Sequence, residues 1–310
     1  MNPIWLYGVT VIVWGSSWLA VKHQVGVVAP EASLVYRFAL AALVMMVLCV
    51  LRRERMRFEL ADHARMATIG LLLFCANFFF IYSGMETLTS GLASVAFSTV
   101  VGMNILIGAA LFGEPIRPRV AAGAALGMAG IAVVFWPEVR AFDVESGTLR
   151  GLGLVLLGTA SASLGMLSSA RAQRRGLPVF QANAYGMVYG TLFLLALCLA
   201  RGTPFDFDPR PAYVISLAYV TVFASVIGFW SYLTLVGRIG ADRAAYASVL
   251  FPVVALALST AFEGFVWSIH HVIGVAVVLA GNVLVLTRGR AKPPIAAEIP
   301  TPETAIGKAT

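Results

Sequence analysis

The sequence predicts an all-α integral membrane protein in which ten transmembrane helices form two inverted five-helix repeats. Three observations support this prediction. Hydrophobic residues make up 59% of the 310-residue chain and charged residues only 12%, which is about half the charged fraction of a soluble domain. Ten apolar runs have the length needed to cross a bilayer. The two halves of the chain also match each other at a nearly constant offset.

Short connections that contain Pro, Gly and charged residues separate the apolar runs. The first run has no basic segment before it and no small-residue cleavage site after it, so we expect an uncleaved span rather than a signal peptide. The tail from position 291 is rich in Pro and Ala and is expected to be disordered. The runs cover approximately residues 3–21, 33–51, 66–85, 90–112, 119–136, 151–169, 179–200, 212–235, 243–262 and 269–287.

A duplication is visible in the sequence itself. The segment from Gly91 to Glu114 matches the segment from Gly240 to Glu263 at an offset of 149 positions, and paired glycines follow in both copies. Since five spans per half is an odd number, the second copy must be inserted upside down, which is typical of transporters that frame one site between two halves. The predicted organisation is a first repeat at 1–136, an external linker at 137–150, a second repeat at 151–290 and a disordered cytoplasmic tail at 291–310.

The basic residues predict the orientation. On alternate sides of the ten runs, 16 of the 22 Lys and Arg residues fall on one side, and such an excess marks the cytoplasmic face. Both termini are therefore expected in the cytoplasm. The net charge of +7 comes mainly from short clusters such as 52–57 and 171–175. Because no folded basic surface or aromatic platform accompanies them, we expect no nucleic-acid contact.

The sequence does not indicate an enzyme. It has no phosphate-binding GxxxxGK[ST] loop, no HExxH and no GxSxG, and its three cysteines lie singly, so we expect no cofactor and no metal. Ser268 beside His270 and His271 is the nearest approach to a catalytic group. No Asp or Glu lies near the centre of a run, which favours facilitated diffusion or exchange over proton antiport.

Several motifs recur in one known family. They are the segment from Trp14 to Trp18, the Tyr-Arg-Phe of 36–38, the Ser and Thr residues of the fourth run, the paired Glu114 and Glu263, and the segment from Phe251 to Val253. With the ten-run layout, they make residues 4–287 resemble the bacterial EamA-type branch of the drug/metabolite transporter superfamily. The resemblance implies a permease of the bacterial inner membrane that exports or exchanges small metabolites, often amino acids, through a central cavity.

The same superfamily leaves a second function open, namely a flippase or permease for lipid-linked or other amphipathic metabolites. The implied partners are a small zwitterionic substrate and the lipid bilayer. One departure from many family members is Met103, which occupies the repeat position of Pro252. Glycine-lined faces on the fifth and tenth runs could pack within the chain or form a homodimer seam.

Polar and aromatic residues inside the runs are the candidates for lining the cavity. Small polar side chains can instead hold helices together, and aromatic ones can face lipid or its interface. Phe97 and Tyr246 share one repeat position, so we expect them to face each other across the cavity. The candidate substrate-binding residues are Trp14, Ser17, Arg37, Asn77, Tyr82, Phe97, Asn104, Tyr185, Trp230 and Tyr246.

Three charged residues and one proline are candidates for further roles. Arg37 could snorkel to the outer surface, or its guanidinium could capture a substrate carboxylate. Glu114 and Glu263 end matched runs, where a carboxylate opposes the helix dipole, so each is expected to bind nearby backbone donors as a structural or gating element. Pro252 is assigned to the same structural and gating group.

Overall fold

The computed structural model is entirely helical in its regular structure over the residues that it describes, which are 2–113, 118–137, 147–239 and 247–286. Within these ranges, seven helical segments are long and apolar enough to cross a membrane, and three shorter apolar helices bring the total to ten. The predicted ten-helix, all-α membrane fold is thereby confirmed.

The first five spans begin at clear local signals. Asn2 caps the first helix, since its Oδ1 accepts from the backbone N–H of Ile4 at 3.0 Å, and Pro3 and Pro30 occupy first-turn positions that need no N–H. The spans are α1 (Pro3–Lys22), α2 (Pro30–Leu51), the consecutive α3 (Leu60–Ile69), η1 (Gly70–Ala76) and α4 (Asn77–Gly84), the pair α5 (Ser90–Phe97) and α6 (Val100–Phe112), and α7 (Pro118–Val134).

The second five spans repeat this order. The third of them, like the third of the first set, is interrupted by a wide π-helical segment. The spans are α9 (Thr148–Arg174), α10 (Val179–Arg201), the consecutive α11 (Pro211–Tyr219), η2 (Val220–Ile227) and α12 (Gly228–Ile239), α14 (Ala247–Phe262) and α15 (Ile269–Leu286).

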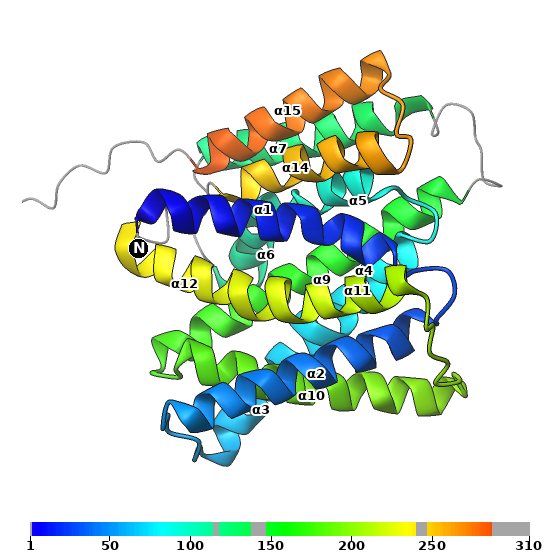
Figure 1. The fold of residues 1–310 in the computed structure, drawn as a ribbon. Coiled ribbons are helices and arrows are strands. Elements are labelled where there is room, and N and C mark those ends of the chain that lie inside the picture. The colour runs from blue at the N-terminus through cyan, green and yellow to red at the C-terminus, as the bar shows by residue number, and fades with distance from the viewer. Residues whose placement is uncertain (1, 114–117, 138–146, 240–246, 287–310) are drawn as a thin grey trace, which may run out of the picture.

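Successive spans run in opposite directions along one axis, which lies horizontally in Figure 1. We name the two ends of the bundle after the first helix. The Pro3 end carries the start of α1 and of α10, and the Lys22 end carries the start of α2 and of α9.

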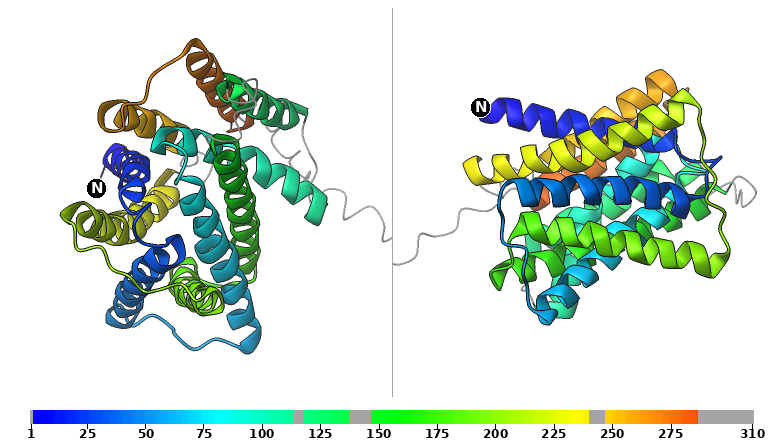
Figure 2. Two further views of the ribbon diagram at one scale, coloured as in Figure 1. Left: turned by 90° about the vertical axis from the view of Figure 1, so that its right-hand side faces the viewer. Right: turned by 60° about the horizontal axis from the view of Figure 1, so that its bottom comes forward.

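Eight of the ten spans form a closed ring. The second span (α2) packs on the seventh (α10), and the seventh packs on the third (α3, η1 and α4). The third span packs on the sixth (α9), and the sixth packs on the fourth (α5 and α6). The fourth span packs on the ninth (α14), the ninth on the first (α1), and the first on the eighth (α11, η2 and α12). The eighth span packs on the second and closes the ring. The left view of Figure 2 shows several of these helices nearly end-on, among them α1, α2 and α10. Exchanging the two halves of the chain maps every one of these contacts onto another contact of the ring or, for the second–seventh and fourth–ninth pairs, onto itself, as an inverted repeat requires.

The fifth and tenth spans, α7 and α15, lie outside the ring and pack tightly on each other. Their glycine faces make this possible, because a Cβ on Gly123 would lie only 2.7 Å from the carbonyl oxygen of Gly281, and Gly130 and Gly274 meet in the same way. These faces are occupied by a contact within one chain.

The two π-helical segments occupy equivalent places. Residues 70–76 of η1, moved by the repeat offset, coincide with the start of η2 at 220–227. A π-helical turn bonds its N–H groups one residue further back than an α-helix does, and it is found mostly at functional positions. Each half of the protein therefore has one widened turn in the middle of its third span.

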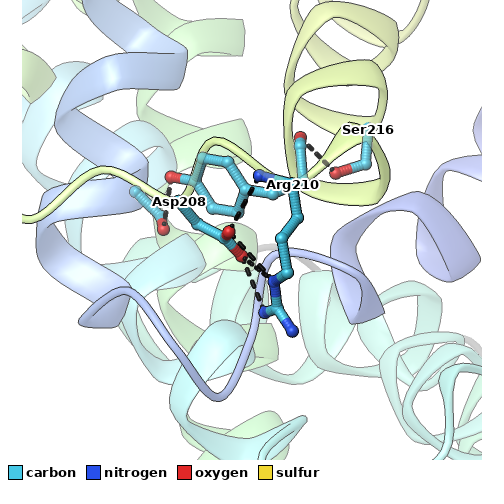
Figure 3. Close-up of polar contacts among 5 residues, drawn as sticks. Asp208, Arg210 and Ser216 are labelled. Carbon is cyan, nitrogen blue, oxygen red and sulfur yellow. Dashed lines mark hydrogen bonds and ion pairs between the residues drawn. The ribbon is translucent and has the colours of Figure 1, made fainter.

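The connection before α11 is fixed by a charged pair at the Lys22 end (Figure 3). The Asp208 carboxylate accepts from the backbone N–H of Arg210 at 3.0 Å, from its Nε at 2.9 Å and from its Nη2 at 2.7 Å. These bonds hold the pKa of the Asp208 carboxyl below its ordinary value, chiefly through the side-chain hydrogen bonds from Arg210. Within α11, the Ser216 hydroxyl donates back to the carbonyl of Tyr213 at 2.8 Å.

Candidate functional site

One polar contact between the repeats occurs twice, once at each end of the ring. At the Lys22 end, the Thr203 hydroxyl donates to Glu31 Oε1 at 2.7 Å. At the Pro3 end, Gln181 Nε2 donates to Glu54 Oε2 at 3.0 Å. Gln181 lies 150 positions after Glu31, and Thr203 lies 149 positions after Glu54. The two contacts are thus the same contact in the two inverted halves, and they join α2 to α10 at both ends.

The Lys22 end carries a further link across the repeats, from Glu263 to Ser90, and a link within the first repeat, from Lys22. Both carboxylate oxygens of Glu263 accept from the backbone N–H of Ser90 at 3.1 Å, and one also accepts from the Ser90 hydroxyl. Ser90 is the first residue of α5, so Glu263 places its charge at the positive end of that helix's dipole. Lys22 Nζ donates to the carbonyl oxygens of Met85 and Leu88 at 2.5 and 2.9 Å. Glu114, the repeat counterpart of Glu263, lies outside the described residues.

Arg37 lies inside the bundle, with only 4% of its surface exposed. Its Nη1 donates to the Tyr82 hydroxyl at 3.1 Å, and that hydroxyl donates to Gln24 Oε1 at 3.1 Å. The guanidinium also lies over the Phe78 ring, 4.5 Å from its centroid. Arg37 therefore joins α2 to α4 and to the connection after α1.

A hollow of about 210 Å³ lies in the half of the ring nearer the Pro3 end. It is bounded by α2, α10 and the eighth span, and its rim carries the exposed side chains of Arg52 and Trp230. Arg52 also stacks over the ring of Phe180, 5.2 Å from its centroid. The lining residues are Leu48, Arg52, Phe180, Val226, Ile227 and Trp230.

The position of Leu48 on α2 places this hollow on the inner side of the ring. The exposed face of α2 is purely aliphatic, as a lipid-facing surface is, and includes Leu40, Leu43 and Val47. Leu48 is instead on the face that carries Arg37, three helical turns away, and this face is turned toward both ring neighbours of α2. Eleven residues of α-helix place Arg37 about 16 Å deeper in the ring than Leu48.

The first helix of each repeat donates a side-chain hydrogen bond to the π-helical segment of the other. Trp14 Nε1 on α1 donates to the carbonyl oxygen of Ala224 in η2 at 2.9 Å. The Ser161 hydroxyl on α9 donates to the carbonyl oxygen of Leu72 in η1 at 2.8 Å. A widened turn leaves such carbonyls less completely bonded along the helix, so an outside donor can satisfy them.

Trp14 is also the centre of an aromatic cluster. Its ring lies 5.3 Å from Phe229, 5.2 Å from Tyr232 and 5.6 Å from Phe251, measured between centroids. These partners come from α12 and from α14, whose Pro252 is buried inside the helix. The cluster thus fixes α1 to the eighth and ninth spans.

The remaining polar candidates make local contacts. The Ser17 hydroxyl donates to the carbonyl of Trp14 at 2.8 Å within α1. Asn77 Nδ2 donates to the carbonyl of Leu73 at 3.1 Å, and Asn104 Nδ2 contacts Met166 Sδ at 3.8 Å. Neither amide oxygen has a partner among the described residues, although both are buried.

The remaining aromatic candidates are divided between the two ends of the ring. Phe97, on α5, packs on Trp18 with 5.3 Å between ring centroids. Tyr246, its expected partner across the cavity, lies outside the described residues. Tyr185 donates to the carbonyl of Met56 at 2.8 Å and so ties α10 to the connection between α2 and α3.

Sequence reasoning missed three of the residues that form these contacts. Gln24 follows the first span, Ser90 begins the fourth, and Ser161 is one of several serines in the sixth. Only the repeat offset carried a signal, because it relates Glu31 to Gln181. The pairing itself depends on how the helices pack.

The comparisons with known proteins agree with this architecture. A solved crystal structure has the same fold, with a TM-score of 0.64 and 19% sequence identity over 91% of this chain and 96% of that chain. The chain is 27% identical to the uncharacterized inner membrane transporter YedA of Escherichia coli over 92% of both proteins. It is 24% identical to the uncharacterized transporter YyaM of Bacillus subtilis, covering 86% of this chain and 88% of that protein.

The family itself follows from a match to each half of the chain. Residues 2–136 and 149–287 each match the EamA-like transporter family. Two such units, and a ring of eight helices closed by contacts that obey the inverted repeat, agree with a transporter rather than an enzyme. This chain belongs to the EamA-like transporter family.

Proposed function

We propose that this protein is a secondary transporter that exports or exchanges small metabolites, with amino acids as the favoured substrates, across the bacterial inner membrane. The observation that carries the proposal is the repeated contact of Glu31 with Thr203 and of Gln181 with Glu54. A pair of oppositely inserted halves with equivalent contacts can exchange conformations and so present one site to either side. YedA, named as an inner membrane transporter, supports the proposed location.

The orientation in this proposal follows from the basic residues. Among the residues that the structure describes, most of the Lys and Arg residues lie toward the Pro3 end, including Arg52 and the cluster around Arg174, and the positive-inside rule assigns that end to the cytoplasm. The hollow beside Trp230 then lies on the cytoplasmic side of Arg37, and the links of Glu263 and Lys22 lie on the external side. This arrangement supports a state that is closed outside and receives substrate from the cytoplasm.

Movement is proposed to occur around a fixed pair of helices. The α2–α10 contact is present at both ends of the same structure. If the two repeats exchange conformations during transport, this contact can therefore stay as it is. The link of Glu263 to Ser90 is our proposed outer gate. By the repeat offset, Glu114 would serve the same role on the cytoplasmic side. The widened turns η1 and η2 give the third and eighth spans places to bend.

The driving force is proposed to be the substrate gradient or exchange. The buried carboxylates Glu31 and Asp208 lie at the Lys22 end, where Arg201 and Arg210 pair with them, rather than halfway along a span. A proton relay through the membrane would use a carboxylate or histidine in mid-span.

Purified protein in liposomes tests the proposal. Labelled amino acids, including phenylalanine, leucine and threonine, should enter protein-containing vesicles faster than empty ones, and trans-side unlabelled substrate should accelerate exchange. Adding a pH gradient should change the rate little. If no amino acid moves and fluorescent phospholipid is scrambled instead, the protein is the flippase of the alternative proposal.

A further inference from the structure

We propose that Arg37, with Tyr82 and Gln24, binds a carboxylate group of the transported molecule, so that the substrates are small carboxylates or zwitterions. The inference rests on the proposed transport function and adds the chemical class of the substrate. It starts from the charge of Arg37, because a guanidinium cannot lose its proton in a protein. A permanent cation buried in a membrane bundle is costly unless an opposite charge accompanies it.

The protein itself does not supply that opposite charge in the part of the chain that the structure describes. The buried and half-buried carboxylates described at the Lys22 end are engaged elsewhere: Glu31 accepts from Arg201 at 3.2 Å, Asp208 from Arg210 and Glu263 from Ser90. The ion pairs of the described residues do not include Arg37. The aromatic rings of Phe78 and Phe38 offset only part of its charge.

The orientation of the guanidinium leaves a recognisable edge free. Nη1 is used by the Tyr82 hydroxyl, whereas Nε is buried without any partner among the described residues. The Nε and Nη2 groups point along two parallel directions, which is the geometry that receives both oxygens of a carboxylate. Gln24 Nε2 is a second buried donor without a described partner, on the other side of the Tyr82 hydroxyl. The unused groups of this cluster are thus all donors, and an anion is their complement.

The depth of the site fits a transport pathway. Arg37 lies eight residues into the 22-residue α2, a few residues from its midpoint. Its face of α2 leads to the hollow beside Leu48 and Trp230 about 16 Å away. A molecule arriving through this hollow would pass Arg52 at its rim and then the aliphatic and aromatic walls before it reached Arg37. Neutral donors and one guanidinium can then fix the carboxylate end and leave the rest of the molecule to the apolar walls.

A set of matched probes tests the carboxylate requirement. Phenylalanine, 3-phenylpropionate and phenethylamine share one hydrocarbon body and differ in charged groups, and leucine, 4-methylvalerate and isoamylamine form the aliphatic set. Binding to the purified full-length protein is measured by ligand-induced thermal stabilisation. We expect the acids or zwitterions of at least one set to stabilise the wild type, and neither amine to do so. Glycerol 3-phosphate is included to distinguish a phosphate from a carboxylate.

Variants then assign the recognition to Arg37. Arg37→Lys keeps the charge but loses the two-pronged edge, so affinity for the acid should fall at least ten-fold, and Gln24→Ala and Tyr82→Phe should weaken it several-fold. Arg150→Lys, on an exposed arginine at the same end, should bind as the wild type does. Size exclusion and circular dichroism confirm that each variant is folded; Tyr82→Phe and Gln24→Ala keep the test available if Arg37 variants do not fold.

Three outcomes would overturn the inference: stabilisation by the amines as strong as by the acids, unchanged affinity in folded Arg37→Lys, or binding of glycerol 3-phosphate with no carboxylate bound. Flux separates this inference from the transport function. Amine flux that is indifferent to Arg37 would leave a transporter without a carboxylate site. Arg37-dependent binding of acids without flux would leave the site and remove the transport function.

Discussion

The indole nitrogen of Trp14 lies 2.9 Å from the carbonyl oxygen of Ala224 and donates a hydrogen bond to it across the boundary between the repeats. Ala224 belongs to the widened turn η2, and the reciprocal bond runs from Ser161 to Leu72 in η1. The first span of each half therefore supports the irregular point in the third span of the other. In a bilayer this matters, because water cannot replace a missing donor in the hydrocarbon region.

Trp14→Phe tests how much this hydrogen bond contributes to stability and transport. Phenylalanine keeps an aromatic ring against Phe229 and Tyr232 but has no N–H, so the Ala224 carbonyl loses its side-chain donor. We expect a loss of about 1–3 kcal/mol of stability, measured by circular dichroism on heating, and slower transport, measured as flux into liposomes. Trp5→Phe, on an exposed tryptophan of the same helix, is the control. Equal melting temperatures for the two variants would show that the bond contributes nothing.

Gly228→Ala tests the same junction from the other side. A Cβ at Gly228 would overlap the Trp14 indole nitrogen, so the indole must move away from Ala224. We expect the alanine variant to lose transport and to melt at a lower temperature. Gly153→Ala is the matched control, because a Cβ there meets no atom within 4 Å. Since alanine is the better helix former, Gly153→Ala should be neutral or slightly stabilising. A fully active Gly228→Ala would contradict the packing described here.

Glu263→Gln tests the proposed outer gate. The amide keeps one oxygen for the Ser90 N–H but loses the charge at the start of α5, which should weaken the link by about 1 kcal/mol. A single cysteine at Ser94, a buried position one turn further into the ring, reports opening in a background without Cys49, Cys75 and Cys198. We expect water-soluble thiol reagents to label Ser94→Cys several-fold faster when Glu263→Gln is also present. Glu86→Gln, at an exposed carboxylate of the same end, should leave labelling unchanged.

The Asp208–Arg210 pair predicts a local dependence on pH. In the folded protein the pKa of Asp208 is lowered from an ordinary value of 3.8. The charged carboxylate therefore stabilises the connection fully above about that pH, and this stabilisation is lost as the pH falls through the lower folded pKa. Hydrogen exchange in residues 203–210 should therefore accelerate as the pH falls below 3.8, after correction for intrinsic exchange rates. Asp208→Asn should exchange faster at neutral pH and lose this acid dependence. If the wild type and Asp208→Asn share one pH profile, the carboxylate does not hold the connection.

The fold could be predicted from the sequence because its main signal is local. Each apolar run is a continuous stretch, and the offset between Gly91 and Gly240 relates whole segments rather than single contacts. The confirmed ten-helix architecture follows from these two features. The widened turns were not predicted, since residues 70–76 and 220–227 are as apolar as the α-helical turns around them. A π-helical turn changes which backbone groups bond, and side-chain hydropathy does not record that change.

The candidate site was accessible to sequence reasoning only in part. Arg37 was chosen because a charged group is expensive in a span, and Tyr82 was chosen as an aromatic residue that could line the cavity. The structure brings them together at 3.1 Å. Gln24 accepts a hydrogen bond from Tyr82 and lies in the connection between α1 and α2. A polar residue is ordinary in a connection, so the sequence does not mark Gln24 as part of a site. The positions of Phe97 and Trp230 depend on the rotation of each helix about its axis, which hydropathy determines poorly when every face is apolar.

The contact that occurs at both ends of the ring leads to a final prediction. In a single structure, Glu31 contacts Thr203 and Gln181 contacts Glu54. When the two repeats exchange conformations, these two contacts only change places, so α2 and α10 need not separate during transport. In the cysteine-free background, a short bifunctional thiol cross-link between Glu31→Cys and Thr203→Cys should leave at least half of the transport rate.

The matching cross-link between Ser90→Cys and Glu263→Cys should abolish transport until it is reduced, because it joins the two residues of the proposed outer gate. Both pairs lie at the Lys22 end and bridge the repeats, so each serves as the control for the other. The decisive comparison is the flux before and after reduction. Inhibition at Glu31 and Thr203 with free transport at Ser90 and Glu263 would reverse the assignment, because α2 and α10 would then be the pair that parts during transport.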